Sequence, residues 1–255
     1  MSSTPTAARE AADAAWPSGP LVRPAAWEEM VQAWPGRRVR RTSIRGGRSA
    51  VAELAAQGWV DSTGRFSDQA REALPNAANP AYTWHVTGRH QGVVSEVRAH
   101  GRQTDSTLSV GPDAATLRAA SGDRARNQGP ESSVSIRVLD SREIPTLLCA
   151  WAGVRPGASS TTPRLELPVP AFTARANGLA SSPPPEFEHA RELWNDDWFI
   201  WDVVAPSGAE HGFIGTLDHG NFAFGQVFSG DDTQIRLVPI GSGAIWRILE
   251  GAQQM

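Results

Sequence analysis

The chain has 255 residues, and all 24 of its basic residues are arginine, because the sequence contains no lysine. This excludes Schiff-base and pyridoxal enzymes and the phosphate-loop lysine of nucleotide-binding proteins. The formal net charge of −3 is too small to indicate a nucleic-acid or membrane partner by itself. The single cysteine, Cys149, excludes an internal disulfide and a multi-cysteine zinc site, and its apolar neighbours predict a buried side chain.

The first 24 residues mix charged residues with alanine and proline, and they contain no apolar core of signal-peptide length. No membrane-spanning run follows anywhere in the chain. We therefore predict a disordered tail over residues 1–24 and one domain over residues 25–255. The protein is expected to be cytoplasmic, without membrane insertion.

Three helices are predicted before the first strand. Apolar residues recur at helical spacing from Ala25, and that helix ends at Pro35 and Gly36. A second helix covers roughly residues 49–57. A third begins after Ser67, a favourable N-cap, and is expected to end at Pro75.

The rest of the chain presents nearly the same pattern twice. Alternating residues predict strands at 82–87, 93–99, 107–110 and 135–139, followed by a helix at 144–151. Strands at 198–204, 212–217, 222–228 and 234–238 and an apolar closing helix repeat this order. An edge strand over 165–169 and a helix over 186–194 precede the second copy. This predicts an α+β fold with a pseudo-two-fold duplicated unit, whose central antiparallel sheet is covered by helices, with sub-repeats about 82–155 and 165–255.

From Ala50 onward the order of elements resembles the EspG family, the type VII (ESX) secretion-associated chaperones of actinobacteria. The resemblance covers about 200 residues and is carried by Leu54, Gly58-Trp59-Val60-Asp61, Gly64, Phe66, Ala70, Leu74, Asn79-Pro80, residues 134–139, Ile144-Pro145, Gly212-Phe213-Ile214 and residues 221–228. Residues 1–24 and the arginine segment 37–48 lie outside the family pattern. The turn at 101–106 is also shorter than the long loop that contacts clients in some members.

The resemblance implies a cytosolic protein without catalytic residues, cofactor or metal. Such a protein binds the apolar helical tip of a PPE-type client carried as a PE–PPE pair, keeps it soluble and directs it to its secretion system. The sequence leaves open whether the chain forms a homodimer, which secretion system it serves and which client it binds.

The aromatic residues of the second half are the candidate partner-binding residues. Phe222, Phe224 and Phe228 fall on one face of a predicted strand, whereas the other face carries small residues, which suit a closely packed helix. We therefore expect the phenylalanine face to be open, with Trp201 and Phe213 as further anchors. The alternative is that these rings belong to the core.

Two other functions compete with this interpretation. The arginine segment, Arg37 to Arg48 beside Trp34, has the composition of a phosphate-binding segment, which makes a nucleic-acid-binding or regulatory protein the alternative function. We expect a solvated linker and no nucleic-acid partner, because the net charge is −3 and no RNA-binding signature or helix-turn-helix spacing accompanies the segment. His85 with His100, or Asp218 beside His219, suggests a metal or general-base site and hence a hydrolase. Adjacent strand residues point to opposite faces, so Asp218 and His219 are expected to form only a hairpin turn.

Overall fold

The computed structural model describes residues 21–34, 36, 38–39, 50–119, 133–155, 162–179, 182–229 and 232–253. Within this part of the chain the protein is α+β, with helices packed on a ten-stranded antiparallel sheet of strand order β1-β5-β4-β3-β2-β7-β8-β9-β10-β6. The chain divides into two compact units. Among the described residues, unit 1 comprises 21–84, 97–112 and 133–144, and unit 2 comprises 85–96, 113–119, 145–155, 162–179, 182–229 and 232–253.

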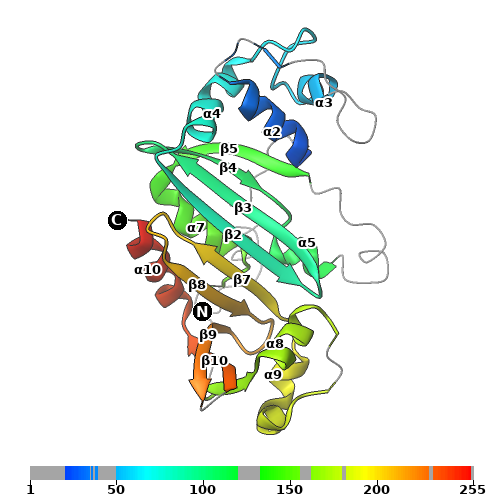
Figure 1. Ribbon diagram of the computed structural model, residues 1–255, viewed down its shortest axis with the longest axis vertical. Helices are drawn as coiled ribbons and strands as arrows, with labels where there is room; N and C mark the ends of the chain where they lie inside the picture. Colours follow the sequence, from blue (N-terminus) through cyan, green and yellow to red (C-terminus); the bar gives the residue numbers. More distant parts are fainter. Residues whose placement is uncertain are drawn as a thin grey trace, which may run out of the picture. The chain divides into compact units, whose positions relative to one another are not determined.

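Unit 1 contains three α-helices, which lie beside strands β4 and β5 of the sheet (Figure 1). Its elements are β1 (Leu21–Val22), α2 (Pro24–Ala33), α3 (Ala50–Ala56), α4 (Asp68–Ala78), the start of β2 (Tyr82–His90), the end of β3 (Val93–Gly101), β4 (Asp105–Val110), β5 (Val134–Asp140) and the 3-10 helix η1 (Ser141–Glu143). Trp27, Trp59 and Leu74 from the helical segment pack with Ile136 of β5 in one apolar core.

Unit 2 contains the rest of the sheet. Its elements are α5 (Ala114–Ala119), α7 (Ile144–Trp151), β6 (Leu165–Pro168), α8 (Val169–Ala176), the 3-10 helix η2 (Pro185–Ala190), α9 (Arg191–Asn195), β7 (Phe199–Val204), β8 (Glu210–Gly215), β9 (Asn221–Ser229), β10 (Asp232–Ile240) and α10 (Ser242–Gln253). Its apolar core includes Phe187, Trp194 and Trp198, whose rings contact one another, with Ile214 and Phe222 of the sheet.

The predicted duplication is present in the order of elements. Strands β2, β3, β4 and β5 lead to α7, and β7, β8, β9 and β10 lead to α10. A short edge strand also pairs with the last strand of each copy: β1 pairs with β5, and β6 pairs with β10. The sub-repeats 82–155 and 165–255 differ from the compact units, whose boundaries fall inside β2 and β3. The single domain over 25–255 stays a prediction.

The helical predictions before the sheet need two corrections. Order begins before Ala25, because Val22 is a buried residue of β1 and Pro24 occupies the first turn of α2, where a missing N–H costs nothing. The predicted tail is therefore wrong for residues 21–24, and residues 1–20 lie outside the described residues. Ser67 caps α4 as predicted, but the helix continues through Pro75 to Ala78, because Asn76 and Ala77 are buried and hold its last turn.

Two further elements differ from the prediction in unit 2. The helix expected over 186–194 is a 3-10 helix followed by the short helix α9. Helix α8 follows β6 directly and was not predicted. The edge position of β6 is as predicted, since Pro168 lacks the N–H that a further strand would need.

Candidate functional site

Three of the five predicted partner-binding residues are core residues. The side chains of Trp201, Phe213 and Phe222 are at most 1% exposed. Trp201 and Phe213 stand opposite each other on β7 and β8, with ring centroids 4.7 Å apart. Their assignment to an open face is therefore wrong, because they fill the interior of unit 2.

The face of β9 that carries Phe222 and Phe224 is covered at its inner end. Phe224 is half-buried, and its ring lies 5.0 Å from that of Phe172 in α8. The small-residue face was expected to receive a helix, yet Gly225 is exposed, and no atom lies within 4 Å of the position that a Cβ would take there. The prediction that the phenylalanine face is open is therefore wrong at Phe222 and Phe224, which the core and α8 cover, and the helix expected on the other face is absent beside Gly225 in the described part of the chain.

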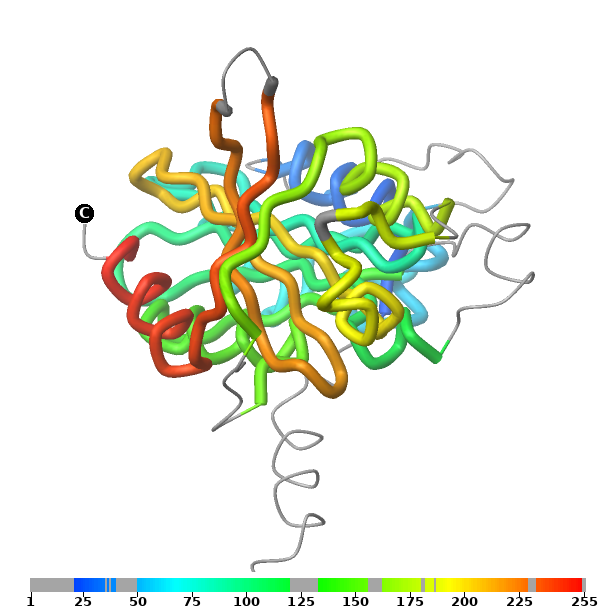
Figure 2. Tube along the Cα trace, turned by 90° about the horizontal axis from the view of Figure 1, so that it is seen from below, coloured from blue at the N-terminus to red at the C-terminus, as the bar shows by residue number. Residues whose placement is uncertain are grey.

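Phe228 is the one predicted partner-binding residue that is open to solvent, with 83% of its surface exposed. The pairing of β8 with β9 ends at Gly212 and Phe224, whereas β9 continues to Ser229 against β10. Figure 2 shows the β9–β10 hairpin, in orange, projecting beyond the neighbouring strands of unit 2. We call residues 225–228 the outer β9 segment.

An ion pair lies beside the inner end of the outer β9 segment. Arg236 of β10 stands opposite Gly225, and its Nε donates to Oε1 of Glu166 in β6 at 2.7 Å. The two opposite charges neutralise each other, and both side chains are more than one third exposed. The outer β9 segment therefore presents an exposed aromatic ring on one face, which suits an apolar partner, whereas Gly225 and the Arg236–Glu166 ion pair lie on the other face.

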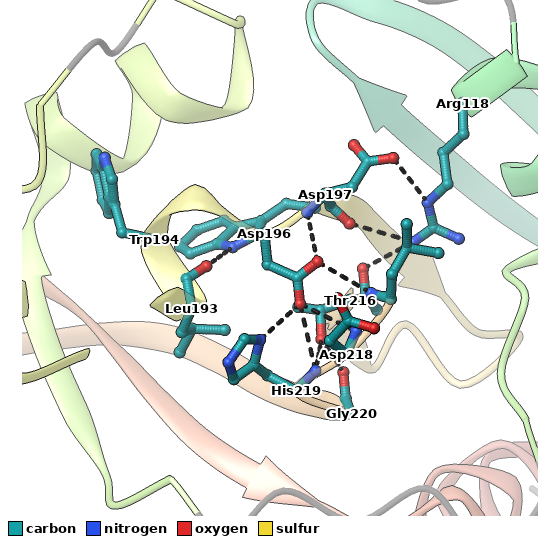
Figure 3. A network of polar contacts seen from close by, with 12 residues as sticks. Arg118, Leu193, Trp194, Asp196, Asp197, Thr216, Asp218, His219 and Gly220 are labelled. Carbon is teal, nitrogen blue, oxygen red and sulfur yellow. Dashed lines mark hydrogen bonds and ion pairs between the residues drawn. The ribbon is translucent and has the colours of Figure 1, made fainter. Parts of the chain in front are cut away.

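A polar network supports the root of this hairpin (Figure 3). The carboxylate of Asp196, in the loop between α9 and β7, is 4% exposed and accepts five hydrogen bonds. The donors are the N–H groups of Asp197 (2.6 Å), Leu217 (3.3 Å), Asp218 (3.1 Å) and His219 (3.2 Å), and Nδ1 of His219 (2.7 Å). This one carboxylate thus ties the α9–β7 loop to the β8–β9 turn.

Two arginines hold the same loop from neighbouring helices. Arg175 of α8 donates to the carbonyl oxygens of Trp194 and Asp196, and its guanidinium lies over the Trp198 ring. Arg118 of α5 donates to the carbonyl oxygens of Asp197 (3.4 Å) and Gly215 (3.0 Å). Burial lowers the pKa of both arginines, and the charge of Asp197 opposes that shift.

His90, at the end of β2, completes the network from the sheet. Its Nδ1 lies 3.1 Å from the carbonyl oxygen of Trp198 and 3.3 Å from Oδ1 of Asp197. Both neighbours are acceptors, so Nδ1 carries the proton. The other ring nitrogen is buried and has no hydrogen-bond partner among the described residues.

The charge state of Asp196 follows from its bonds. Burial raises the pKa of this carboxyl, but the hydrogen bonds from His219 and from backbone N–H groups outweigh burial, so the pKa lies below its ordinary value. Asp196 is therefore ionised at neutral pH, and His219 holds its Nδ1 proton toward it. The pair resembles the acid–base part of a catalytic triad, but the contacts of His219 in the described part of the chain are to Asp196 and Thr216.

The other histidine combinations considered from sequence do not form. Asp218 and His219 belong to the five-residue turn between β8 and β9, as expected, and Asp196 orients the imidazole instead. His85 lies beside Glu96, whereas Nδ1 of His100 lies beside the hydroxyl of Thr83. Among the described residues, no group of three or more His, Cys, Asp or Glu side chains could hold a metal ion.

Cys149 is buried, as predicted, and burial raises the pKa of its thiol to about 12. No helix in the described ranges is both long and apolar enough to cross a membrane. The arginine segment 37–48 lies outside the described residues except for residues 38 and 39, so the predicted solvated linker and its alternative, a nucleic-acid-binding or regulatory segment, stay untested.

Sequence reasoning missed Asp196 and its two arginine supports. Asp196 lies more than twenty residues before the turn it binds, and no motif joins the two segments. The only available signal was the adjacent pair of aspartates between two tryptophans, Trp194 and Trp198. Comparison with protein-family models finds no match for the chain, and a search of curated proteins finds none either.

Proposed function

We propose that this chain is a cytoplasmic, non-enzymatic chaperone of type VII (ESX) secretion, as its resemblance to the EspG family implies. It binds the apolar helical tip of a PPE-type client in a PE–PPE pair, keeps that client soluble and directs it to its secretion system. The observation that carries this proposal is the exposure of Phe228 at the end of a hairpin that projects beyond its neighbouring strand.

Phe228 has the chemistry of an interface anchor. Burying a phenylalanine side chain in an interface stabilises it by roughly 1.5–3 kcal/mol, and aromatic residues are enriched among the residues that dominate binding. Gly225, three residues earlier, faces the opposite side of the strand, so the anchor that the outer β9 segment offers on the phenylalanine face is Phe228 alone. An apolar helical tip would meet the Phe228 ring on the phenylalanine face of the outer β9 segment.

The fold supports the same proposal at a coarser level. The EspG resemblance implied a central antiparallel sheet of quasi-two-fold symmetry, and the order of elements is that of a duplicated four-strand meander with a closing helix. Fold alone does not define function. The client-binding role therefore rests on the exposed hairpin.

The test is a binding measurement with Phe228→Ser and a purified PE–PPE-type heterodimer. We expect the dissociation constant to rise about ten- to one-hundred-fold, because the variant loses the burial of one aromatic side chain. The melting temperature is expected to change little, since the ring is solvent-exposed in the free protein.

Leu179→Ser is the matched control, since Leu179 is also an exposed apolar residue of unit 2, with 75% of its surface open to solvent. This variant should bind the client like the wild type. Equal loss of affinity in both variants would indicate non-specific apolar adhesion. A Phe228→Ser variant that binds like the wild type would remove the outer β9 segment from the client site.

A further inference from the structure

The outer β9 segment is held from one side only. Residues 221–224 of β9 lie between β8 and β10, but beyond Phe224 the strand has β10 as its only strand neighbour in the described part of the chain. The direction of this hairpin is set at its root and along β10, whose residues 234–236 pair with β6. The root consists of the first residues of β9 and of the turn that leads into them.

The turn at the root depends on a group outside it. Its own bonds join Thr216 to the carbonyl oxygen of Gly220, through the N–H (3.0 Å) and the hydroxyl (2.8 Å). Three consecutive N–H groups, those of residues 217–219, donate to the carboxylate of Asp196, and the N–H of His219 also donates to the hydroxyl oxygen of Thr216 at 3.0 Å. Successive N–H groups of this kind form an anion-binding nest, and here the protein supplies the anion itself.

The backbone of Asp196 is itself held in place by a neighbouring helix. Arg175 binds the carbonyl oxygen of Asp196, and it belongs to α8, the helix whose Phe172 covers Phe224. One helix therefore contacts both the covered face of β9 and the loop that holds the root of β9. The charged groups facing Asp196 are Arg175, Arg118, Asp197 and His219.

We infer that Asp196 is a positioning residue of the client surface: its carboxylate fixes the β8–β9 turn, and this turn, together with the pairing of β10 with β6, sets the direction in which the outer β9 segment projects. This inference rests on the proposed function. Asp196 needs no contact with the client, because it acts through the turn and β9.

The test compares Asp196→Asn with Asp218→Asn. Asp196→Asn replaces the ionised acceptor of three turn N–H groups by an uncharged amide. Asp218→Asn changes an exposed carboxylate, and Asp218 binds Asp196 through its backbone N–H and not through its side chain. Hydrogen exchange of residues 217–229 reports on the turn and the strand without any client. We expect faster exchange there in Asp196→Asn and no change in Asp218→Asn.

Affinity for a purified PE–PPE-type heterodimer is the second measurement. Asp196→Asn should raise the dissociation constant by about two- to thirty-fold, the range over which residues remote from a ligand modulate binding. In the Phe228→Ser background this effect should shrink, because Asp196 acts through the placement of Phe228. Asp196→Glu, which keeps an ionised acceptor, should restore part of the affinity and the protection.

His219→Gln is the milder variant if Asp196→Asn does not fold, since it removes only the Nδ1 bond and should shift both readouts in the same direction. Unchanged exchange at residues 217–229 would overturn the inference, as would faster exchange with unchanged client affinity. A wild-type protein that binds no PE–PPE-type pair would instead refute the proposed function and this inference with it, while the exchange data would still show whether Asp196 holds the turn.

Discussion

At the scale of single residues, the carboxylates of this protein have opposite electrostatic environments. Asp202 lies on the central strand β7, and burial raises its pKa, with Glu210 acting in the same direction and Arg89 opposing both. Asp61 is fully exposed in a turn, and hydrogen bonds from Thr63 and from the N–H of Arg65 lower its pKa. The two residues should therefore affect stability with opposite signs.

Asp202→Asn is expected to raise the melting temperature at pH 7. A raised folded-state pKa means that the native state binds a proton more tightly than the unfolded state, so Asp202 costs stability as the pH rises from the ordinary value of about 3.9 through the folded pKa. The variant and the wild type should melt together below that window. Calorimetry from pH 3 to pH 7 measures the difference.

Asp61→Asn provides the contrast, because a lowered pKa gives stability that is present above the ordinary pKa and lost as the pH falls through the folded value. This variant should melt lower than the wild type at pH 7 and approach it in acid. Finding Asp202→Asn less stable than the wild type at neutral pH would show that the Asp202 carboxylate is stabilised by interactions stronger than its burial cost.

At the scale of elements, the strands were easier to predict than their environment. Alternating residues placed all the longer strands, since that period is a local property of the sequence. The helix α8 was missed because Pro168 and Pro170 suggest an edge strand and a loop. Nothing in the sequence indicated that Phe172 of this helix covers Phe224, so the phenylalanine face of β9 was expected to be open along its length, whereas it is open at Phe228.

Two glycines on strands of unit 2 test this packing. A Cβ at Gly88 of β2 would lie 2.4 Å from the ring of Phe199 and 2.5 Å from that of Trp151, whereas a Cβ at Gly225 would meet nothing. Gly88→Ala should lower the free energy of unfolding by about 1–3 kcal/mol through overpacking. Gly225→Ala should leave it unchanged or raise it slightly, because alanine restricts the unfolded chain.

Urea denaturation of both variants, with the wild type alongside, measures these free energies. Equal effects of the two substitutions would contradict the packing described for β2 and β9. A strongly destabilised Gly225→Ala would mean that another part of the chain occupies the space beside the outer β9 segment, and that segment would then not be available to a partner.

At the scale of the whole molecule, the duplicated meander explains why the order of elements could be predicted while the site could not. Each repeat is specified by local patterns that recur about a hundred residues apart, and each ends in an apolar helix. The polar network instead joins Arg118, Asp196 and His219, which are distant in sequence and belong to one helix, one loop and one turn. Such a site depends on tertiary packing, which sequence periodicity does not encode.

We propose that the outer β9 segment binds the apolar helical tip of a PPE-type client. The most direct measurement is size-exclusion chromatography with light scattering after co-expression of the wild-type protein, or of its Phe228→Ser variant, with a PE–PPE-type pair. We predict a stable complex containing all three chains for the wild type and its loss for the variant, with both proteins folded. A wild-type protein that elutes without the pair would contradict the claim.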